Sequence, residues 1–214
     1  MSTKIPLVFA ALLVLGGCQQ AYYSTMEKMG VHKRDILVDR VEAARDSQIE
    51  TKEQFETALE RFSSVANFSG GDLEDQYREL NDEYEKSVEK AEAVHERIAA
   101  VEGVAQALFD EWGSEIDQYS NEKYRRVKAA ELKDARKRYG ALIKSMQKAE
   151  AKIEPVLRVF KDQVLFLKHS LNARAVAALK SELKNVTADV SSLVREMQAS
   201  IDASNEFIQS LGQI

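Results

Sequence analysis

Apolar residues recur at alternating steps of three and four along most of the chain. One run with this spacing lies between Leu37 and Val65, and a second lies between Leu73 and Trp112. In the first run the repeating positions are Leu37, Val41, Ala44, Gln48, Thr51, Phe55, Ala58, Phe62 and Val65. In the second they are Tyr77, Leu80, Tyr84, Ser87, Ala91, Val94, Ile98, Val101, Ala105, Leu108 and Trp112. A sustained repeat of this kind predicts long helices that pack side by side in coiled-coil fashion.

Two more runs continue the pattern in the second half of the chain. The third consists of Leu132, Ala135, Tyr139, Leu142, Met146, Ala149, Ile153, Val156, Phe160, Val164, Leu167 and Leu171. The fourth consists of Leu179, Leu183, Val186, Val190, Leu193, Met197, Ile201, Ser204, Ile208 and Leu211. Pro155 lies inside the third run and predicts a bend, because proline lacks a backbone N–H and clashes with the preceding turn of a helix.

Three short segments separate the runs and predict turns. In "NFSGGD", Asn67 to Asp72, two glycines can end a helix and the aspartate can cap the next one. A second turn is expected at Gln118 to Asn121, and a third between Ser170 and Arg174, where Asn172 is expected to end the third helix. The prediction is an all-α fold, an elongated antiparallel coiled-coil-like bundle of about four long helices. Each helix would be roughly 60 Å long.

The chain begins with a segment of a different kind. A polar start containing Lys4 precedes an unbroken apolar run from Ile5 to Leu15. That run is shorter than the roughly 20 residues that cross a bilayer as a helix, and is typical of a secretory signal peptide. The tetrapeptide Leu15-Gly16-Gly17-Cys18 resembles the lipobox of bacterial lipoproteins, in which the cysteine is lipidated and the residues before it are removed. We therefore predict a signal peptide over 1–17, a lipidated N-terminus and tether over 18–30, and one elongated helical domain over 31–214.

Cys18 is the only cysteine of the chain. A buried, inert thiol is the alternative interpretation, but the position of Cys18 and the residues before it favour lipidation. A lone cysteine also excludes an intramolecular disulfide and a site built from several cysteines. The next residue is Gln19 rather than aspartate. By resemblance to enterobacterial sorting rules, this predicts a lipid anchor in the outer membrane with the protein facing the periplasm.

Composition narrows the range of partners. The 214 residues carry a net charge of −5, which becomes −6 when Lys4 is removed with the signal peptide. An acidic balance gives no reason to expect nucleic-acid binding, which usually shows a basic one. With nine glycines, two prolines and 30% charged residues, the chain has the composition of a helical protein.

Candidate chemistry is sparse. His32, His95 and His169 have no second histidine or cysteine at the spacing of metal ligands, so we expect solvated or capping histidines and no metal site. The string from Glu92 to His95 matches one half of a di-metal motif of helical bundles, but a single copy is a weak signal. No phosphate-binding loop and no serine-nucleophile motif occurs in the sequence. We therefore expect a non-enzymatic protein without a cofactor.

The strongest charge feature is "KYRRVKAAELKDARKR", Lys123 to Arg138, with eight basic residues and two acids. One interpretation is a solvated face whose cations pair with glutamates of neighbouring helices. The other is contact with anionic lipid, because an up-down-up-down topology places this segment at the end of the bundle where the chain leaves its anchor. The candidate lipid-contact residues are Arg125, Arg126, Lys128, Arg136, Lys137 and Arg138.

Two further stretches resemble a known family. "YYSTMEKMGVHKRDILVDRV", Tyr22 to Val41, and "PVLRVFKDQVLFLKHSLNARAVAALKSEL", Pro155 to Leu183, are similar to bacterial predicted lipoproteins grouped as domain-of-unknown-function family 2959. The resemblance implies a helical periplasmic lipoprotein and brings no catalytic residue, ligand or partner.

We expect a membrane-anchored scaffold, spacer or accessory subunit of the cell envelope that binds another envelope protein. Whether it forms a homo-oligomer stays open. The alternative is a carrier of a lipid or other small apolar ligand, held in a groove between the aromatic residues of the repeats.

Overall fold

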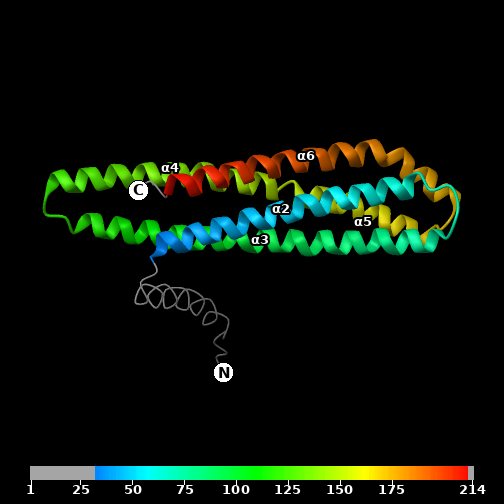
Figure 1. Cartoon of the computed structure of the whole chain (residues 1–214), viewed down its shortest axis with the longest axis horizontal. Coiled ribbons are helices and arrows are strands. Elements are labelled where there is room, and N and C mark those ends of the chain that lie inside the picture. Colours follow the sequence, from blue (N-terminus) through cyan, green and yellow to red (C-terminus); the bar gives the residue numbers. More distant parts are fainter. Residues whose placement is uncertain (1–31, 212–214) are drawn as a thin grey trace, which may run out of the picture.

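The computed structural model describes residues 32–211, and every regular element in that range is an α-helix. The helices are α2 (Lys33–Ala66), α3 (Leu73–Asp117), α4 (Glu122–Glu150), α5 (Ile153–His169) and α6 (Ala173–Leu211). They run alternately along one long axis, and α4 and α5 follow each other in a single row (Figure 1). The resulting four rows form an elongated antiparallel bundle, which confirms the predicted fold class.

The repeating positions of α2 face the interior along the whole helix. All nine of them are buried, and Leu37, Phe55 and Phe62 are completely inaccessible to solvent. Positions that step by three and four lie on one face of a helix, so their burial aligns α2 lengthwise against its neighbours. The first run of the sequence therefore gives the correct buried face.

The first two predicted turns are confirmed, and capping side chains fix where the following helices begin. Gly71 adopts a φ of 123°, which residues with a Cβ atom rarely adopt. The next residue, Asp72, accepts a hydrogen bond from the Glu74 N–H at 2.8 Å and caps α3. In the second turn, Asn121 accepts a bond from the Lys123 N–H at 2.9 Å and caps α4 in the same way.

The third turn is where expected, but two of its residues behave differently from the prediction. The side chain of Asn172 accepts a hydrogen bond from the Arg174 N–H at 2.9 Å, so this residue caps the start of α6 instead of ending α5. The last position of the third run, Leu171, lies in the turn and is 42% exposed. The expectation that it is buried is wrong, because α5 ends at His169 before the repeat reaches it.

The third run is interrupted between α4 and α5. Ala151 and Lys152 keep right-handed helical backbone angles, but the Lys152 N–H bonds to the carbonyl of Ala149, three residues back. Pro155 follows as the third residue of α5, where an N–H would have no partner within the helix. Its ring would clash with the carbonyl four residues back, which belongs to Ala151. The break between α4 and α5 therefore lies directly before Pro155, where the sequence predicts a bend.

Packing places α2 diagonally across the bundle from the α4–α5 row. Both rows pack along α3 and α6, and their side chains meet in the centre. Phe160 of α5 is 2% exposed, and its ring centroid lies 6.2 Å from those of Phe55 and Phe62 on α2. Aromatic pairs at such distances add to the stability that area burial provides. This cluster is the core of the half of the bundle that contains the α2–α3 turn.

A polar layer crosses the core between α2 and α6. Gln48 is fully buried, and neither its amide nitrogen nor its amide oxygen has a hydrogen-bonding partner among the described residues. Ser200 on α6 is also fully buried, and its hydroxyl likewise has no partner there. Thr51, by contrast, donates to the carbonyl of Ser47 at 2.7 Å. The layer therefore contains buried polar groups of which only some are compensated.

At one end the rows have unequal lengths. α3 has 45 residues and α2 has 34, so their far ends cannot coincide. The amine of Lys33, at the start of α2, lies 2.9 Å from a carboxylate oxygen of Glu111, and α3 continues past that contact to Asp117. At 1.5 Å per residue this extension is about 10 Å long. The α3–α4 hairpin therefore projects beyond the start of α2 and the end of α6 (Figure 1).

Candidate functional site

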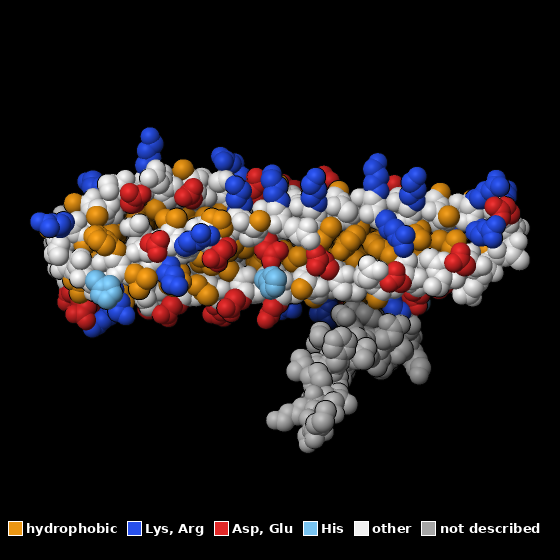
Figure 2. All heavy atoms as spheres, turned by 180° about the vertical axis from the view of Figure 1, so that it is seen from behind, with side chains coloured by type: hydrophobic (Ala, Val, Ile, Leu, Met, Phe, Trp, Pro, Cys, Tyr) orange, Lys and Arg blue, Asp and Glu red, His pale blue; other side chains and the backbone are white. Residues whose placement is uncertain are grey.

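The basic segment forms the first turns of α4, at the projecting end of the bundle. Figure 2 shows one long face of the molecule with a group of Lys and Arg side chains at its right-hand end, which is the α3–α4 end. The start of α2, with His32 and Arg34, lies at the same end of the bundle. The structure thus places the basic segment at the end of the bundle where the described chain begins, as the topology predicts.

Four of the six candidate lipid-contact residues are paired with acids of their own helix. The pairs are Arg125 and Arg126 with Glu122, Lys128 with Glu131, and Arg138 with Asp134. All lie at spacings of three or four residues, and none is buried. The hydrogen bond from Lys128 to Glu131 raises the pKa of that lysine. Exposed pairs contribute at most about 1 kcal/mol each, so their cations can exchange a carboxylate for another anion.

The remaining two candidates differ from each other. Arg136 donates to the carbonyl of Phe109 at 3.1 Å, and its guanidinium lies 5.7 Å from the centre of the Phe109 ring. It therefore connects α4 to α3. Lys137 has no hydrogen bond or ion pair within residues 32–211, and the same holds for the side chains of Lys123 and Lys133. Lys123 and Lys133 also lie in the basic segment, although neither is among the six candidates.

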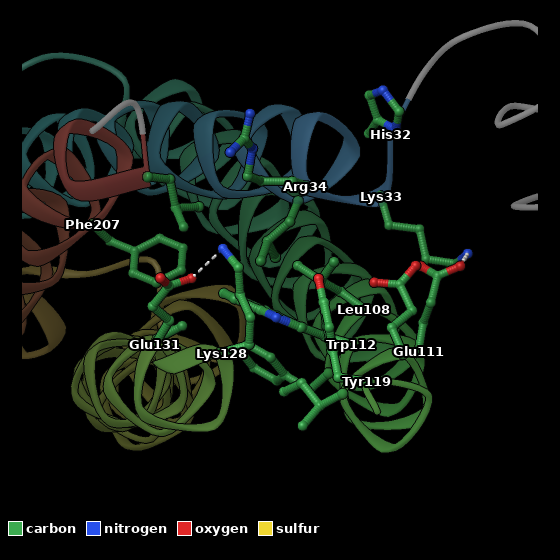
Figure 3. Close-up of a pocket in the computed structure, with 16 residues that line it drawn as sticks. His32, Lys33, Arg34, Leu108, Glu111, Trp112, Tyr119, Lys128, Glu131 and Phe207 are labelled. Atoms are coloured by element: carbon green, nitrogen blue, oxygen red, sulfur yellow. Dashed lines mark hydrogen bonds and ion pairs between the residues drawn. The ribbon is translucent and has the colours of Figure 1, made fainter. Parts of the chain in front are cut away.

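A pocket of about 600 Å³ opens where the four rows reduce to two. Figure 3 shows its lining: Arg34 from α2, Leu108 and Trp112 from α3, Lys128 from α4 and Phe207 from α6. Leu37 and Ile116 also line it and are buried. The pocket exists because α2 and α6 stop while α3 and α4 continue, which leaves apolar side chains of the longer helices partly uncovered.

The charges around this pocket balance. Lys33 pairs with Glu111 at 2.9 Å, and Lys128 pairs with Glu131 at 2.8 Å. Arg34 and Glu115 are the other two charged groups of opposite sign in the lining. The pocket therefore combines an apolar interior with a rim on which three cationic and three anionic side chains balance.

Aromatic rings below the pocket fix the relative positions of α3, α4 and α6. The ring of Tyr139 lies 5.4 Å from that of Phe109 and 6.4 Å from that of Phe207. Burial, together with the charge of Glu102, raises the pKa of Tyr139 to about 12. Phe109 and Phe207 are buried, whereas their neighbours in the predicted repeats, Leu108 and Ile208, are only partly so. Near this end, the buried position therefore lies one residue after the predicted one in α3 and one residue before it in α6.

Exposed large hydrophobic side chains lie at the two ends of the bundle. Among residues 32–211 there are six, and three belong to the α3–α4 end: Tyr119, Tyr124 and Val127. The other three belong to the opposite end, at the α5–α6 turn: Leu165, Phe166 and Leu171. None of these residues was predicted to form an exposed apolar surface, and Leu171 was predicted to lie in the interior. The sequence did indicate exposure of the other five, because they lie outside the repeating positions.

The three histidines lie far from one another within residues 32–211. His95 is exposed, and its Nδ1 lies 2.6 Å from a carboxylate oxygen of Glu150 beside the α4–α5 interruption. This hydrogen bond and the charge of Glu150 raise the pKa of His95. The residues described contain no group of three or more histidine, cysteine, aspartate or glutamate side chains placed to hold a metal ion. His32 and His169 are exposed at opposite ends of the bundle.

The predicted lipidation site, Cys18, lies outside the described residues, as do the signal peptide and most of the tether. Among the helices of residues 32–211, none combines the length and the apolar character that crossing a bilayer requires.

Comparison with known proteins identifies the family. A model described as "Protein of unknown function (DUF2959)" matches residues 22–211. The chain belongs to this family. The match extends over the whole described bundle and confirms the resemblance inferred from the two quoted stretches. Neither the curated proteins nor the solved structures contain a match to this DUF2959 protein.

Proposed function

We propose that this DUF2959 protein is a lipid-anchored, non-enzymatic spacer or scaffold of the periplasm, with its α3–α4 end against the inner leaflet of the outer membrane. One observation carries the proposal. The projecting hairpin, the basic segment and the point where the described chain begins are all at the same end of the bundle. A lipid anchor attached through Cys18 would hold that end near the headgroups.

The length of the tether is compatible with this orientation. Thirteen residues separate Cys18 from His32. In an extended conformation they span at most about 45 Å. The hairpin projects about 10 Å beyond the start of α2, so the tether is long enough for the tip of the hairpin to reach the membrane surface.

Two acyl chains give durable anchoring, and cations near an anionic leaflet contribute on the order of 1 kcal/mol each. The pairs described above reduce this contribution, because Glu122, Glu131 and Asp134 compete with phosphate groups for the same cations. Lys137 has no such competitor within the described residues. We therefore expect the basic segment to orient an anchored bundle rather than to bind membranes tightly by itself.

The shape of the bundle favours a structural role. α3 alone has 45 residues, which corresponds to about 68 Å. The groups with shifted pKa values include exposed cations such as Lys86 and Lys90, each raised by a hydrogen bond to a neighbouring carboxylate. Such groups are spread along the outside of the rod and do not converge on one cavity, as catalytic residues usually do.

The end away from the basic segment is the proposed site for a protein partner. Leu165, Phe166 and Leu171 are between 42% and 44% exposed there. Exposed apolar side chains that gather in one place often mark protein-binding surfaces. A photo-crosslinking residue at position 166 should capture an envelope protein in living cells, whereas one at Glu89, on the exposed side of α3, should not. Equal capture at both positions, or none at position 166, would contradict the proposed partner site.

Membrane contact can be tested on protein that begins at residue 19. We expect it to bind vesicles that contain anionic lipid, to bind neutral vesicles less, and to dissociate as salt rises. Changing Arg125, Arg126, Lys128, Arg136, Lys137 and Arg138 to glutamine should weaken binding.

The matched control removes the same charge from the other half of the molecule. It changes Arg158, Lys161, Lys168, Arg174, Lys180 and Lys184 to glutamine, all of which are exposed. Equal losses in both variants would show that only net charge matters and would refute the orientation. In cells, the Cys18→Ser variant should carry no acyl chain and leave the membrane fraction.

The pocket favours a second candidate function, the binding of a small apolar ligand. Its volume of about 600 Å³ is in the usual range for small-molecule sites. Trp112 is the only tryptophan of the chain and lines this pocket, so its fluorescence should respond when a fatty acid binds. Ala135→Phe would fill part of the pocket and should abolish the response, whereas Ala130→Phe, at an exposed position of α4, should retain it. An unchanged Trp112 signal at saturating fatty acid would exclude this function.

A further inference from the structure

The tip of the α3–α4 hairpin carries apolar side chains that the fold does not use. Tyr124 is 58% exposed, Val127 is 48% exposed and Tyr119 is 39% exposed. They lie within nine consecutive residues, on the part of the bundle that extends beyond α2 and α6. Neither of these two helices reaches far enough to cover them.

Two of these side chains share one face of α4. Tyr124 and Val127 are three residues apart, so they are neighbours on the surface of the helix. Tyr119 lies in the turn before that helix, after the end of α3 at Asp117. The three together give the tip an apolar surface surrounded by polar and charged groups.

The charges around the tip select its partner. Lys123, Arg125 and Arg126 alternate with the apolar residues, and Glu122 pairs with both arginines. Glu115 and Asp117 add two more acids at the end of α3. These three cations and three acids cancel, so electrostatic attraction alone would hold the tip only loosely on an anionic surface. A surface that offers both anions and an apolar layer beneath them would use all of these side chains.

We infer that the hairpin tip inserts Tyr119, Tyr124 and Val127 into the interfacial layer of an anionic bilayer. Tyrosine suits this layer because its ring is apolar and its hydroxyl remains hydrated, and tyrosine is enriched at membrane interfaces. The long side chains of Lys123 and Arg125 can place their charges among the phosphate groups while their methylene chains lie along the apolar layer. The inference rests on the proposed function, because it assumes that the anchor holds this end of the bundle at the membrane.

The experiment uses the mature, lipidated protein in vesicles that contain anionic lipid and a lipid brominated on its acyl chain. Trp112→Phe removes the native tryptophan, and Tyr124→Trp then places a single fluorophore at the tip. The matched control has Trp112→Phe with Phe166→Trp, which places the fluorophore at an exposed apolar position of the opposite end, 44% exposed against 58% for Tyr124. Bromine quenches tryptophan only at short range, so we expect at least a twofold loss of fluorescence for the tip probe and none for the control.

A second probe, Val127→Trp, guards against a local effect of one substitution and should be quenched as well. In the Tyr124→Trp probe, Tyr119 and Val127 are changed to serine; in the Val127→Trp probe, Tyr119 and Tyr124 are. Each pair of changes should reduce the quenching of the tryptophan severalfold, because less apolar area then favours insertion. Quenching of the position-166 probe to the same extent would show a rod lying flat on the membrane and would overturn the inference.

The two proposals fail in different ways. If the protein carries no acyl chain and does not enter the vesicles, the proposed function fails. If the lipidated protein is in the vesicles and neither tip probe is quenched, the anchor is correct and the insertion of the tip is refuted.

Discussion

Gln48 offers a direct test of the polar layer in the core. Its side chain is fully buried, and both polar atoms of its amide have no partner among the described residues. Burying an amide without compensation costs about 1–3 kcal/mol in proteins. Gln48→Met keeps the unbranched length of the side chain and removes both polar atoms. We therefore expect the free energy of unfolding to rise by about 2 kcal/mol.

For a domain of this size, that gain corresponds to an increase in Tm of roughly 4–8 °C. Urea denaturation followed by circular dichroism gives the change in free energy, and calorimetry gives the change in Tm. The control is Gln209→Met, because Gln209 is exposed on α6 and should change stability by no more than about 0.5 kcal/mol. A loss of stability in Gln48→Met would refute the reasoning, since it would show that the amide makes compensating hydrogen bonds in solution.

Three further predictions concern the core, a helix cap and an ion pair. Ile98→Asp puts an unpaired charge at a position that is 3% exposed, so it should lower the free energy of unfolding, measured by urea denaturation, by several kcal/mol. Glu89→Gln, at an exposed position, should lower it little. Similar losses in both variants would mean that the buried face of α3 is misassigned. Asp72→Ala removes the cap of α3 and should cost about 1 kcal/mol in thermal melts, while Asp72→Asn should not. The pKa of His95 is raised in the folded protein, so its pair with Glu150 stabilises the fold fully below the unfolded pKa, near 6.5. This contribution disappears as pH rises through the folded pKa. Glu150→Gln should therefore reduce Tm more at pH 6 than at pH 9, and an equal reduction would contradict the assignment.

The spacing of apolar residues was enough to predict the fold class, because burial in a bundle depends on which face of each helix is apolar. It predicted the interior of α2 correctly, including the polar position Gln48. It failed at Phe109 and Phe207, which are buried next to the positions that the repeat selects. At that end α2 and α6 stop while α3 and α4 continue, and a repeat within one helix contains no information about where its neighbours stop.

The candidate site was predictable only where its contacts lie within one helix. The pairing of Arg126 with Glu122 and of Arg138 with Asp134 follows from spacings of four residues on one helix, so it could have been read from the sequence. The contact of Arg136 with Phe109 spans 27 residues and depends on how α3 and α4 align. The pocket, likewise, depends on the difference in length between helices that are far apart in the sequence.

The unequal lengths of the rows also constrain how the protein can change during evolution. Along the four-row part, an insertion in one helix shifts its apolar face relative to three partners, so lengthening the rod requires matched heptads at four places in the gene. Beyond the start of α2, the hairpin has only two rows, and matched additions on either side of residues 118–121 would lengthen it without disturbing the rest. Homologues should therefore differ in size at this tip far more readily than along the shaft, so that the distance spanned by the hairpin changes while the main body of the protein stays the same.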